Sequence, residues 1–435
     1  MTLASTFTPS DSAIKRRDWQ IISLIGTVHA SSHFFQLVLP TLYLSLMHEY
    51  GYDFARLGFL ASVFFLVSCL GQASSGFVVD RIGPAPVLRF GLSCFVVSGL
   101  LIAWSTGYGM LMLAAVIGGL GNSVFHPVDY SIINHRVSPS RLGHAFSTHG
   151  LTGNLGWALT PIFMAAIIHV ANWRTAAFSA AALVAFVLLL TWLGRHLLAG
   201  KNQETVLAGS KVAATQTATP KAGPELGKQT VLQTLATLVS KPALWGAFLF
   251  FACTAIALSS VQNFTIPMLG NVYGIDKVMA GTTLSAYMVA AAAGMLAGGF
   301  LVGATPNTER TVAVSLILAG LLLVVLASGA VPSSFAMALV GLAGFCSGVS
   351  APSRDMLIRK VTPKGATGTV YGLVYSGMDV GSSLAPAGFG ILLDAGYSNA
   401  PWFGGAAGFI VAAALAVWVA KAATAGALRG VTARA

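Results

Sequence analysis

The chain has 435 residues, of which 55% are hydrophobic and 9% are charged, and its mean hydropathy is +0.78. A water-soluble domain of this size could not cover its surface with so few charges, so the composition excludes a soluble protein and indicates one that lies mostly in lipid. The formal charge of +11 would suit nucleic-acid binding, but the basic residues are dispersed over short loops without an aromatic-rich basic patch, and no nucleic-acid partner is expected.

Apolar runs long enough to cross a bilayer occur along the whole chain. A transmembrane helix needs roughly 20 apolar residues. Such runs are expected at residues 19–47, 55–79, 87–106, 109–135, 141–169, 173–196, 242–270, 278–303, 310–330, 333–359, 365–393 and 401–422. The sequence therefore predicts an all-α membrane protein with twelve transmembrane helices.

The basic residues predict the orientation in the membrane. A basic triplet at 15–17 resembles the start of a signal peptide, but the apolar run after it is too long and lacks a small-residue cleavage site, so it is expected to be an uncleaved first span. If both termini are cytoplasmic, every Lys and Arg except Arg56, Arg174 and Lys277 falls on the inner side or within helices near it. This positive-inside asymmetry predicts a multi-pass protein with both termini in the cytoplasm.

Glycine and proline positions repeat between the two halves of the chain. At an offset of 223 residues, Tyr50, Gly51, Asp53, Gly58, Gly71 and Gly76 recur as Tyr273, Gly274, Asp276, Gly281, Gly294 and Gly299. At an offset of 225 residues, Pro127, Gly143, Gly156 and Pro161 recur as Pro352, Gly368, Gly381 and Pro386. Repeated spacing of this kind predicts two pseudo-symmetric six-helix halves, which is a transporter architecture.

One long break separates the halves. Residues 198–240 are rich in Thr, Ala, Gly, Pro and Lys, a composition typical of a flexible cytoplasmic linker. The predicted organisation is an N-terminal half at 1–197, a linker at 198–240 and a C-terminal half at 241–435.

The loop after the second predicted span carries a specific motif. Gly76, Asp80, Arg81 and Gly83 form the pattern Gly-x-x-x-Asp-Arg-x-Gly, which resembles the signature loop of the major facilitator superfamily. In that family the Asp and Arg latch the cytoplasmic side, and the glycines let helices approach. The resemblance implies a gating role for these four residues and a monomeric protein; the alternative is a helix-capping Asp beside an ordinary inside-positive Arg.

Polar residues within the predicted spans are the candidates for a transport pathway. A charged side chain at the centre of a helix costs roughly 2.5–3.5 kcal/mol on insertion, so such groups normally face a cavity or pair with one another. In the first half they are His29, His33 and Gln36 on one face of the first span, Asn122, His126 and Asp129 on one face of the fourth, and His149 and Asn154 on the fifth. In the second half they are Asn263, Arg354, Asp355 and Asp379.

Their chemistry suggests two roles. Histidine changes charge near neutral pH, so a His126–Asp129 pair could carry a proton. Arg354 keeps its charge and presents a fork suited to a carboxylate or phosphonate, with Asp355 as its neutralising partner. Two alternatives stay open: the polar residues only hydrogen-bond between helices, or His29 and His33, four residues apart, hold a metal together with His126 or His149.

A second resemblance is narrower. The segment Ser123-Val-Phe125-His126-Pro127 is similar to the fourth helix of fosmidomycin-resistance-type exporters, whose first helix carries a polar patch where this chain has His33. That family usually has Glu at the position of Val128; the acid here is Asp129, turned by about 100° around the helix. The resemblance implies export across a bacterial cytoplasmic (inner) membrane.

Enzyme and cofactor motifs are absent from the sequence. It has no Gly-x-x-x-x-Gly-Lys phosphate loop, and its four cysteines lie far apart inside predicted helices. We therefore expect no enzyme activity and no cofactor. The leading hypothesis is a secondary transporter that exports small organic anions in exchange for protons by alternating access. The alternatives are uptake of an organic acid by proton symport and transport of a divalent metal.

Overall fold

In the computed structural model, the described residues are 11–198, 242–305, 307–361 and 367–432. Regular structure in these segments is helical throughout. The first half contains α1 (Asp11–Gln36), α2 (Val38–Thr41), α3 (Tyr43–Tyr50), α4 (Phe54–Ile82), α5 (Pro84–Ala103), α6 (Tyr108–Asn122), α7 (Phe125–Arg136), the 3-10 turn η1 (Pro139–Arg141), α8 (Leu142–Val170), α9 (Trp173–Leu193) and α10 (Arg195–Leu198). The second half contains α13 (Pro242–Tyr273), α14 (Lys277–Ala304), α15 (Thr308–Ala327), α16 (Ser333–Val361), α17 (Thr367–Asp394) and α18 (Ala400–Thr432).

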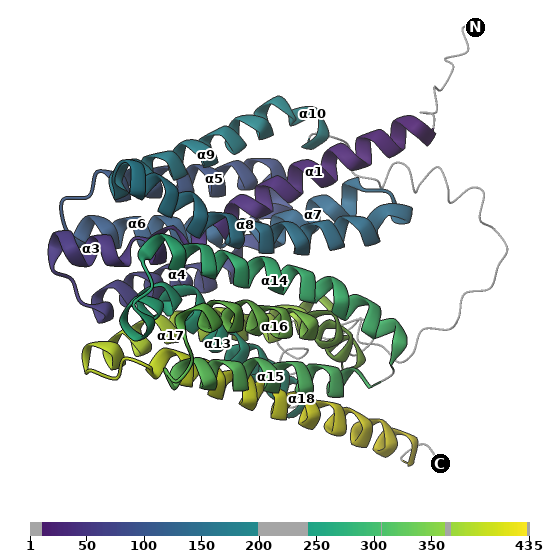
Figure 1. The fold of residues 1–435 in the computed structure, drawn as a ribbon. Helices are drawn as coiled ribbons and strands as arrows, with labels where there is room; N and C mark the ends of the chain where they lie inside the picture. Colours follow the sequence, from purple (N-terminus) through teal and green to yellow (C-terminus); the bar gives the residue numbers. More distant parts are fainter. Residues whose placement is uncertain (1–10, 199–241, 306, 362–366, 433–435) are drawn as a thin grey trace, which may run out of the picture.

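The long helices run roughly side by side, with the purple-to-teal first half against the green-to-yellow second half (Figure 1). The start of α1 and the end of α18 lie at the same end of the bundle, which we call the terminal end (Figure 1). The opposite end, where α3 lies, is the distal end (Figure 1). The predicted linker at 198–240 lies almost entirely outside the described residues.

The twelve predicted spans correspond to long helical segments. Ten of them are long and apolar enough to cross a membrane by length and composition. The other two are the segment α1–α3 and helix α17. Both carry polar residues, including His29 and His33 on α1 and Asp379 on α17, which lower their hydropathy. The all-α membrane architecture is thus confirmed, and ten of the twelve predicted spans meet the criterion for a membrane span within the described residues.

Two predicted spans are broken near their middle. The first span divides where α1 ends at Gln36, and the fourth divides at Ser123–Val124 between α6 and α7. Each break lies four residues before a proline, Pro40 and Pro127 respectively. A proline ring clashes with the carbonyl four residues earlier and removes one helical hydrogen bond, which accounts for both breaks.

The sequence repeat appears as a repeated turn. Gly51 ends α3 with φ of 67°, and Gly274 follows α13 with φ of 65°. Only glycine adopts this left-handed conformation without strain. The next helix is capped in each half by the equivalent side chain, Asp53 for α4 and Asp276 for α14. Equivalent residues therefore make equivalent turns in the two halves.

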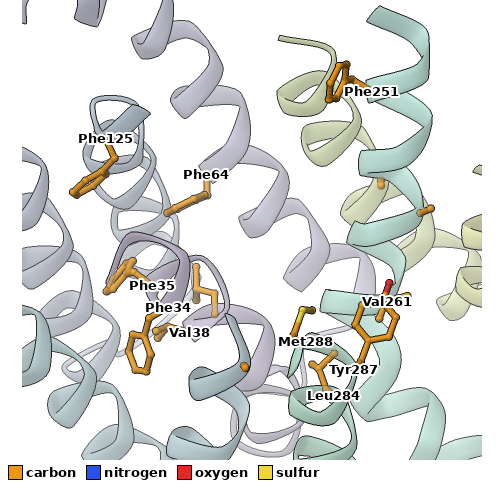
Figure 2. Packing of buried hydrophobic residues seen from close by; sticks show 14 of the residues in the cluster. Phe34, Phe35, Val38, Phe64, Phe125, Phe251, Val261, Leu284, Tyr287 and Met288 are labelled. Carbon is orange, nitrogen blue, oxygen red and sulfur yellow. The ribbon is translucent and has the colours of Figure 1, made fainter. Parts of the chain in front are cut away.

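One cluster of buried hydrophobic residues extends through both halves. Figure 2 shows part of this cluster, with Phe34, Phe35 and Phe125 in the first half and residues such as Tyr287 and Met288 in the second. In the first half, Phe95 stacks between Phe35 and Phe125, with ring centroids 4.5 and 5.1 Å away. This aromatic stack joins the end of α1 to the start of α7. It therefore positions the polar faces of these two helices.

The two halves pack most closely at the distal end, where α4 meets α17. A Cβ at Gly58 would lie 2.1 Å from the carbonyl oxygen of Pro386, and one at Gly390 would lie 2.3 Å from that of Phe54. The Ala387 N–H donates to Ser62 Oγ at 3.1 Å across the same interface. Small residues let the two backbones touch, as in many membrane helix pairs.

Candidate functional site

A buried carboxylate joins three helices of the first half. Oδ2 of Asp129, on α7, lies 3.1 Å from Nδ1 of His29 on α1 and 3.1 Å from Nε2 of His149 on α8. The side chains are 0%, 3% and 5% exposed, respectively. A buried charge is stable only when it is paired and hydrogen-bonded. Asp129 therefore organises a polar centre inside the bundle.

Two more histidines complete this centre. We call His29, His33, His126, Asp129 and His149 the histidine–aspartate cluster. The ring centroids of His29 and His149 are 3.5 Å apart, those of His29 and His33 are 4.4 Å apart, and those of His29 and His126 are 5.4 Å apart. All five residues were sequence candidates, and the fold brings them together.

The pairing within the cluster differs from the sequence prediction. We expected Asp129 to pair with His126, one turn earlier on the same helix. Its carboxylate is instead directed at His29 and His149 on the neighbouring helices. The short aspartate side chain points into the contact of α7 with α1 and α8, which is where an acceptor is needed to satisfy the two buried imidazoles.

A glycine makes room for the cluster. A Cβ at Gly153 on α8 would lie 3.0 Å from His29 Nε2 and 2.9 Å from His33 Cε1. The two imidazoles can therefore rest directly against the α8 backbone. Gly153 is not among the residues predicted from the sequence, and its part in the site follows from the way α1 crosses α8.

A hydrogen-bonded chain continues from the cluster toward α4. Gln36 Nε2 donates to Asn122 Oδ1 at 2.9 Å, and Asn122 Nδ2 donates to Ser68 Oγ at 2.8 Å. Trp157 Nε1 donates to Gln36 Oε1 at 2.9 Å, and its ring lies 4.2 Å from that of His33. The predicted residues Gln36 and Asn122 are thus brought together. Ser68 and Trp157 also belong to this chain but were not predicted as site residues.

The predicted arginine of the second half forms an ion pair. Arg354 Nε donates to Asp355 Oδ1 at 2.9 Å, and the Tyr375 hydroxyl donates to the same oxygen at 3.2 Å. The Arg354 guanidinium lies 5.2 Å from the centroid of the Phe251 ring. Its side chain is 19% exposed and that of Asp355 is 49% exposed. The arginine is therefore held by a carboxylate while part of it remains accessible.

The remaining candidates lie outside these groups. Asn263 accepts a hydrogen bond from the Tyr43 hydroxyl at 3.3 Å, and Asp379 accepts one from Gln72 Nε2 at 3.2 Å, so both contact the opposite half. Asn154 donates to the Gly150 carbonyl one turn earlier in its own helix. Asn154 thus makes a local contact within α8.

The predicted gating motif lies at the terminal end of α4. Arg81 is exposed, and Gly83 adopts φ of 85° in the turn that leads into α5. The side chain of Asp80 and the surroundings of Gly76 lie outside the described part of the structure. The latch therefore stays a prediction.

Comparison with solved structures shows the same fold elsewhere. A bacterial homologue of the human lysosomal transporter Spinster, in an inward-facing and unoccupied conformation, superposes with a TM-score of 0.68. The superposition covers 94% of this chain and 96% of that chain at 15% sequence identity. At this sequence identity the similarity shows a shared fold and nothing about function.

Curated relatives point to the same family. The chain is 34% identical to the fosmidomycin resistance protein of Escherichia coli over 176 residues, which cover 40% of this chain and 43% of that protein. It is 23% identical to a probable L-galactonate transporter of the same organism over 91% of this chain and 90% of that protein. These relatives are transporters or resistance proteins rather than enzymes. A family model matches residues 24–340 and 256–430, and the chain therefore belongs to the Major Facilitator Superfamily as a multi-pass membrane transporter.

Proposed function

We propose that this transporter exports small organic anions across a bacterial cytoplasmic membrane in exchange for protons. The observation that carries the proposal is the shared carboxylate of Asp129, which contacts His29 and His149 inside the first half. Ionisable groups buried at membrane depth in transporters commonly form proton relays. An imidazole in direct contact with a carboxylate can take up or release a proton while the two opposite charges stay next to each other.

Arg354 is the proposed anion-binding group. Its guanidinium stays charged at any physiological pH and offers parallel N–H donors that match a carboxylate or phosphonate. Asp355 orients it through Nε and compensates its charge, and Phe251 borders it. The relative named as a probable L-galactonate transporter handles, by its name, a carboxylate.

Alternating access would use the two halves as moving bodies. The close α4–α17 contact at the distal end supports a state whose open side is the terminal end. In the proposed topology both termini and the 198–240 linker are cytoplasmic, because the basic residues are concentrated on that side. Protonation of the cluster in the first half would be coupled to anion release from Arg354 in the second. The proposed unit is a monomer, as the superfamily resemblance implies.

The relative named for fosmidomycin resistance favours export over uptake. Uptake of an organic acid by proton symport is the second candidate, because the probable L-galactonate transporter matches most of the chain. The two candidates differ in the relative directions of proton and substrate. Antiport moves them in opposite directions and symport moves them together.

The test is proton movement in proteoliposomes that contain the full chain. Internal pH is recorded while carboxylates, phosphonates and divalent metals are presented in turn. Antiport predicts a pH change opposite in sense to the flux of one organic anion, and Asp129→Asn is expected to abolish proton-driven accumulation but to retain substrate exchange. Asp276→Asn, which changes a helix cap in a distal turn, is the control. Loss of both activities, or of neither, in Asp129→Asn would exclude Asp129 as the coupling acid.

A further inference from the structure

Three imidazoles from three different helices meet in the first half. One ring nitrogen each of His29 on α1, His126 on α7 and His149 on α8 lies within 4.8 Å of the other two. We propose that these three histidines bind one transition-metal ion of the Zn²⁺ or Co²⁺ type, with Asp129 as the carboxylate that orients His29 and His149. This inference goes beyond anion transport: it assigns a second ligand to the same cluster, for whose imidazole nitrogens protons and the ion compete.

The spacing is close to that of a metal site. Zinc binds histidine nitrogen at about 2.0–2.1 Å, and catalytic-type sites use three protein ligands with a fourth position open. The three nitrogens lie within 4.8 Å of one another, and side-chain rotation that separates the stacked rings of His29 and His149 would bring them to a common ion. The three ligands come from helices that already pack against one another, so the backbone need not move.

The contacts of Asp129 match those around known metal ligands. Metal-binding histidines usually donate their second ring N–H to a carboxylate, which fixes the ring orientation. Asp129 Oδ2 accepts in this way from His29 Nδ1 and His149 Nε2, so each of these rings keeps a second nitrogen that the carboxylate does not use. Two of the three ligands therefore already have the partner that a metal site requires.

An unpartnered oxygen supports the same conclusion. Within the described part of the chain, the buried Oδ1 of Asp129 has no hydrogen-bond partner. An unsatisfied buried carboxylate oxygen is costly and calls for an explanation. A bound cation nearby, or a water molecule on that cation, would satisfy it and would offset the charge of the carboxylate.

The donor set also selects the class of metal. Imidazole nitrogens with a carboxylate suit Zn²⁺, Co²⁺, Ni²⁺ and Cu²⁺, whereas Mg²⁺ and Ca²⁺ prefer oxygen ligands. Metal binding requires neutral imidazoles, so protons compete for the same nitrogens. All three ligands belong to the first half, and the ion would therefore remain bound while the two halves move.

The test is a Co²⁺ titration of the full chain, purified in detergent without a polyhistidine tag. We expect one Co²⁺ per chain, the visible absorption of four-coordinate Co²⁺, its displacement by Zn²⁺, and weaker binding as the pH falls. His126→Gln and His149→Gln are each expected to weaken binding at least about tenfold. Loss of a residue that only hydrogen-bonds to a metal ligand already weakens metal binding by about that factor. His135→Gln and His169→Gln change exposed histidines and are expected to bind Co²⁺ as the native protein does.

Two results would overturn the inference. One is a native spectrum without four-coordinate Co²⁺; the other is binding that the His126 and His149 variants retain but that His135→Gln or His169→Gln loses. If a ligand variant fails to fold, Asp129→Asn gives the same test, since it removes the orienting carboxylate and is expected to weaken binding about tenfold. The readout is binding and not transport, so failure of the proposed transport activity would leave this result intact.

Discussion

The carboxylate of Asp394 caps a helix that belongs to the other half of the protein. Its Oδ1 accepts a hydrogen bond from the Phe54 N–H at 2.9 Å, and its Oδ2 accepts one from the Ala55 N–H at 2.6 Å. The first N–H groups of a helix have no partner within the helix, and a negative charge is favourable at that end. The end of α17 therefore stabilises the start of α4 only while the halves are in contact at the distal end.

Replacement of Asp394 by alanine is expected to loosen this distal contact. Loss of a helix cap costs about 1 kcal/mol, which corresponds to a roughly fivefold change in an equilibrium. The measurement is the rate at which an impermeant maleimide modifies a cysteine placed at Ser62, a buried position on α4 that bonds Ala387 across the interface. The four native cysteines are replaced by alanine in all samples. We expect Asp394→Ala to raise the rate about fivefold.

Asp276→Ala is the matched control for that experiment. Asp276 also accepts hydrogen bonds from two backbone N–H groups, those of Val278 and Met279, but both belong to its own helix α14. Its loss removes a cap of the same kind without removing a contact between the halves. An equal rise in the modification rate for both variants would show that general loosening, rather than the cap between halves, is responsible.

A methyl group at Gly58 should act on the same interface by steric conflict. The added Cβ would lie 2.1 Å from the Pro386 carbonyl oxygen, which belongs to the other half. We expect Gly58→Ala to hold the distal ends apart and to increase the maleimide reactivity of the Ser62 cysteine more than Asp394→Ala does. Gly299→Ala, where no atom lies within 4 Å of the new Cβ, is the control. Unchanged reactivity in Gly58→Ala would contradict the tight α4–α17 contact.

The sequence predicted the fold better than it predicted the site. Glycine and proline spacing is a property of backbone packing, so the repeat of Gly51 and Asp53 as Gly274 and Asp276 correctly indicated two equivalent halves. Helical periodicity also placed His29 with His33, and Asp129 with His126, on one face of their helices. Periodicity does not say which helices face one another, however, and the contact of Asp129 with His149 depends on how α7 packs against α8.

The breaks in the first and fourth spans also depend on helix packing, which the sequence pattern does not show. Proline is compatible with a continuous membrane helix, as Pro161 in α8 and Pro267 in α13 demonstrate. The presence of Pro40 and Pro127 in the sequence was therefore not enough to predict that the helices break there. Neighbouring helices decide whether the freed backbone groups are satisfied. Gly153 and Trp157 were missed as site residues for a related reason, because their roles arise only where α1 crosses α8.

Gly153→Ala is expected to disturb the histidine–aspartate cluster directly. The new Cβ would lie 2.9 Å from His33 Cε1 and 3.0 Å from His29 Nε2, so both imidazoles must shift. Overpacking of this kind typically costs about 1–3 kcal/mol. We expect a lower melting temperature and loss of proton-driven transport, measured on the same preparation. Gly150→Ala, whose nearest neighbour would be Met295 Sδ at 3.9 Å, should keep both properties, and equal defects in the two variants would contradict the assigned role of Gly153.

Glu49 should make stability depend on pH in a defined direction. Partial burial alone would raise its pKa, but hydrogen bonds from Trp173 and Arg174 and the charge of Arg174 outweigh this, and the pKa of Glu49 lies below its usual value. A lowered pKa in the folded state stabilises the protein above the pKa of the unfolded state, and this stability is lost as the pH falls through the folded-state pKa.

We therefore expect Glu49→Gln to lower the melting temperature at pH 7, by the equivalent of at most about 1 kcal/mol, since both partners are substantially exposed. The difference from the native protein should shrink as the pH is lowered toward 3. The measurement is thermal unfolding in detergent at a series of pH values. A difference that stays constant or grows on acidification would show that the Glu49 charge is not the cause.

Arg354→Lys should separate the charge of this residue from its geometry. Lysine keeps the positive charge but lacks the planar fork and the Nε that donates to Asp355 at 2.9 Å. If Arg354 binds the anion, we expect about tenfold weaker substrate affinity, in line with the loss of roughly one charge-assisted hydrogen bond, and little change in the maximal exchange rate. The measurement is substrate exchange in proteoliposomes over a range of concentrations. Arg310→Lys, a change at an exposed position near the start of α15, is the control and should leave the affinity unchanged. Native affinity in Arg354→Lys, or an equal loss in both variants, would remove Arg354 from the anion site and would leave its pairing with Asp355 as a purely structural contact.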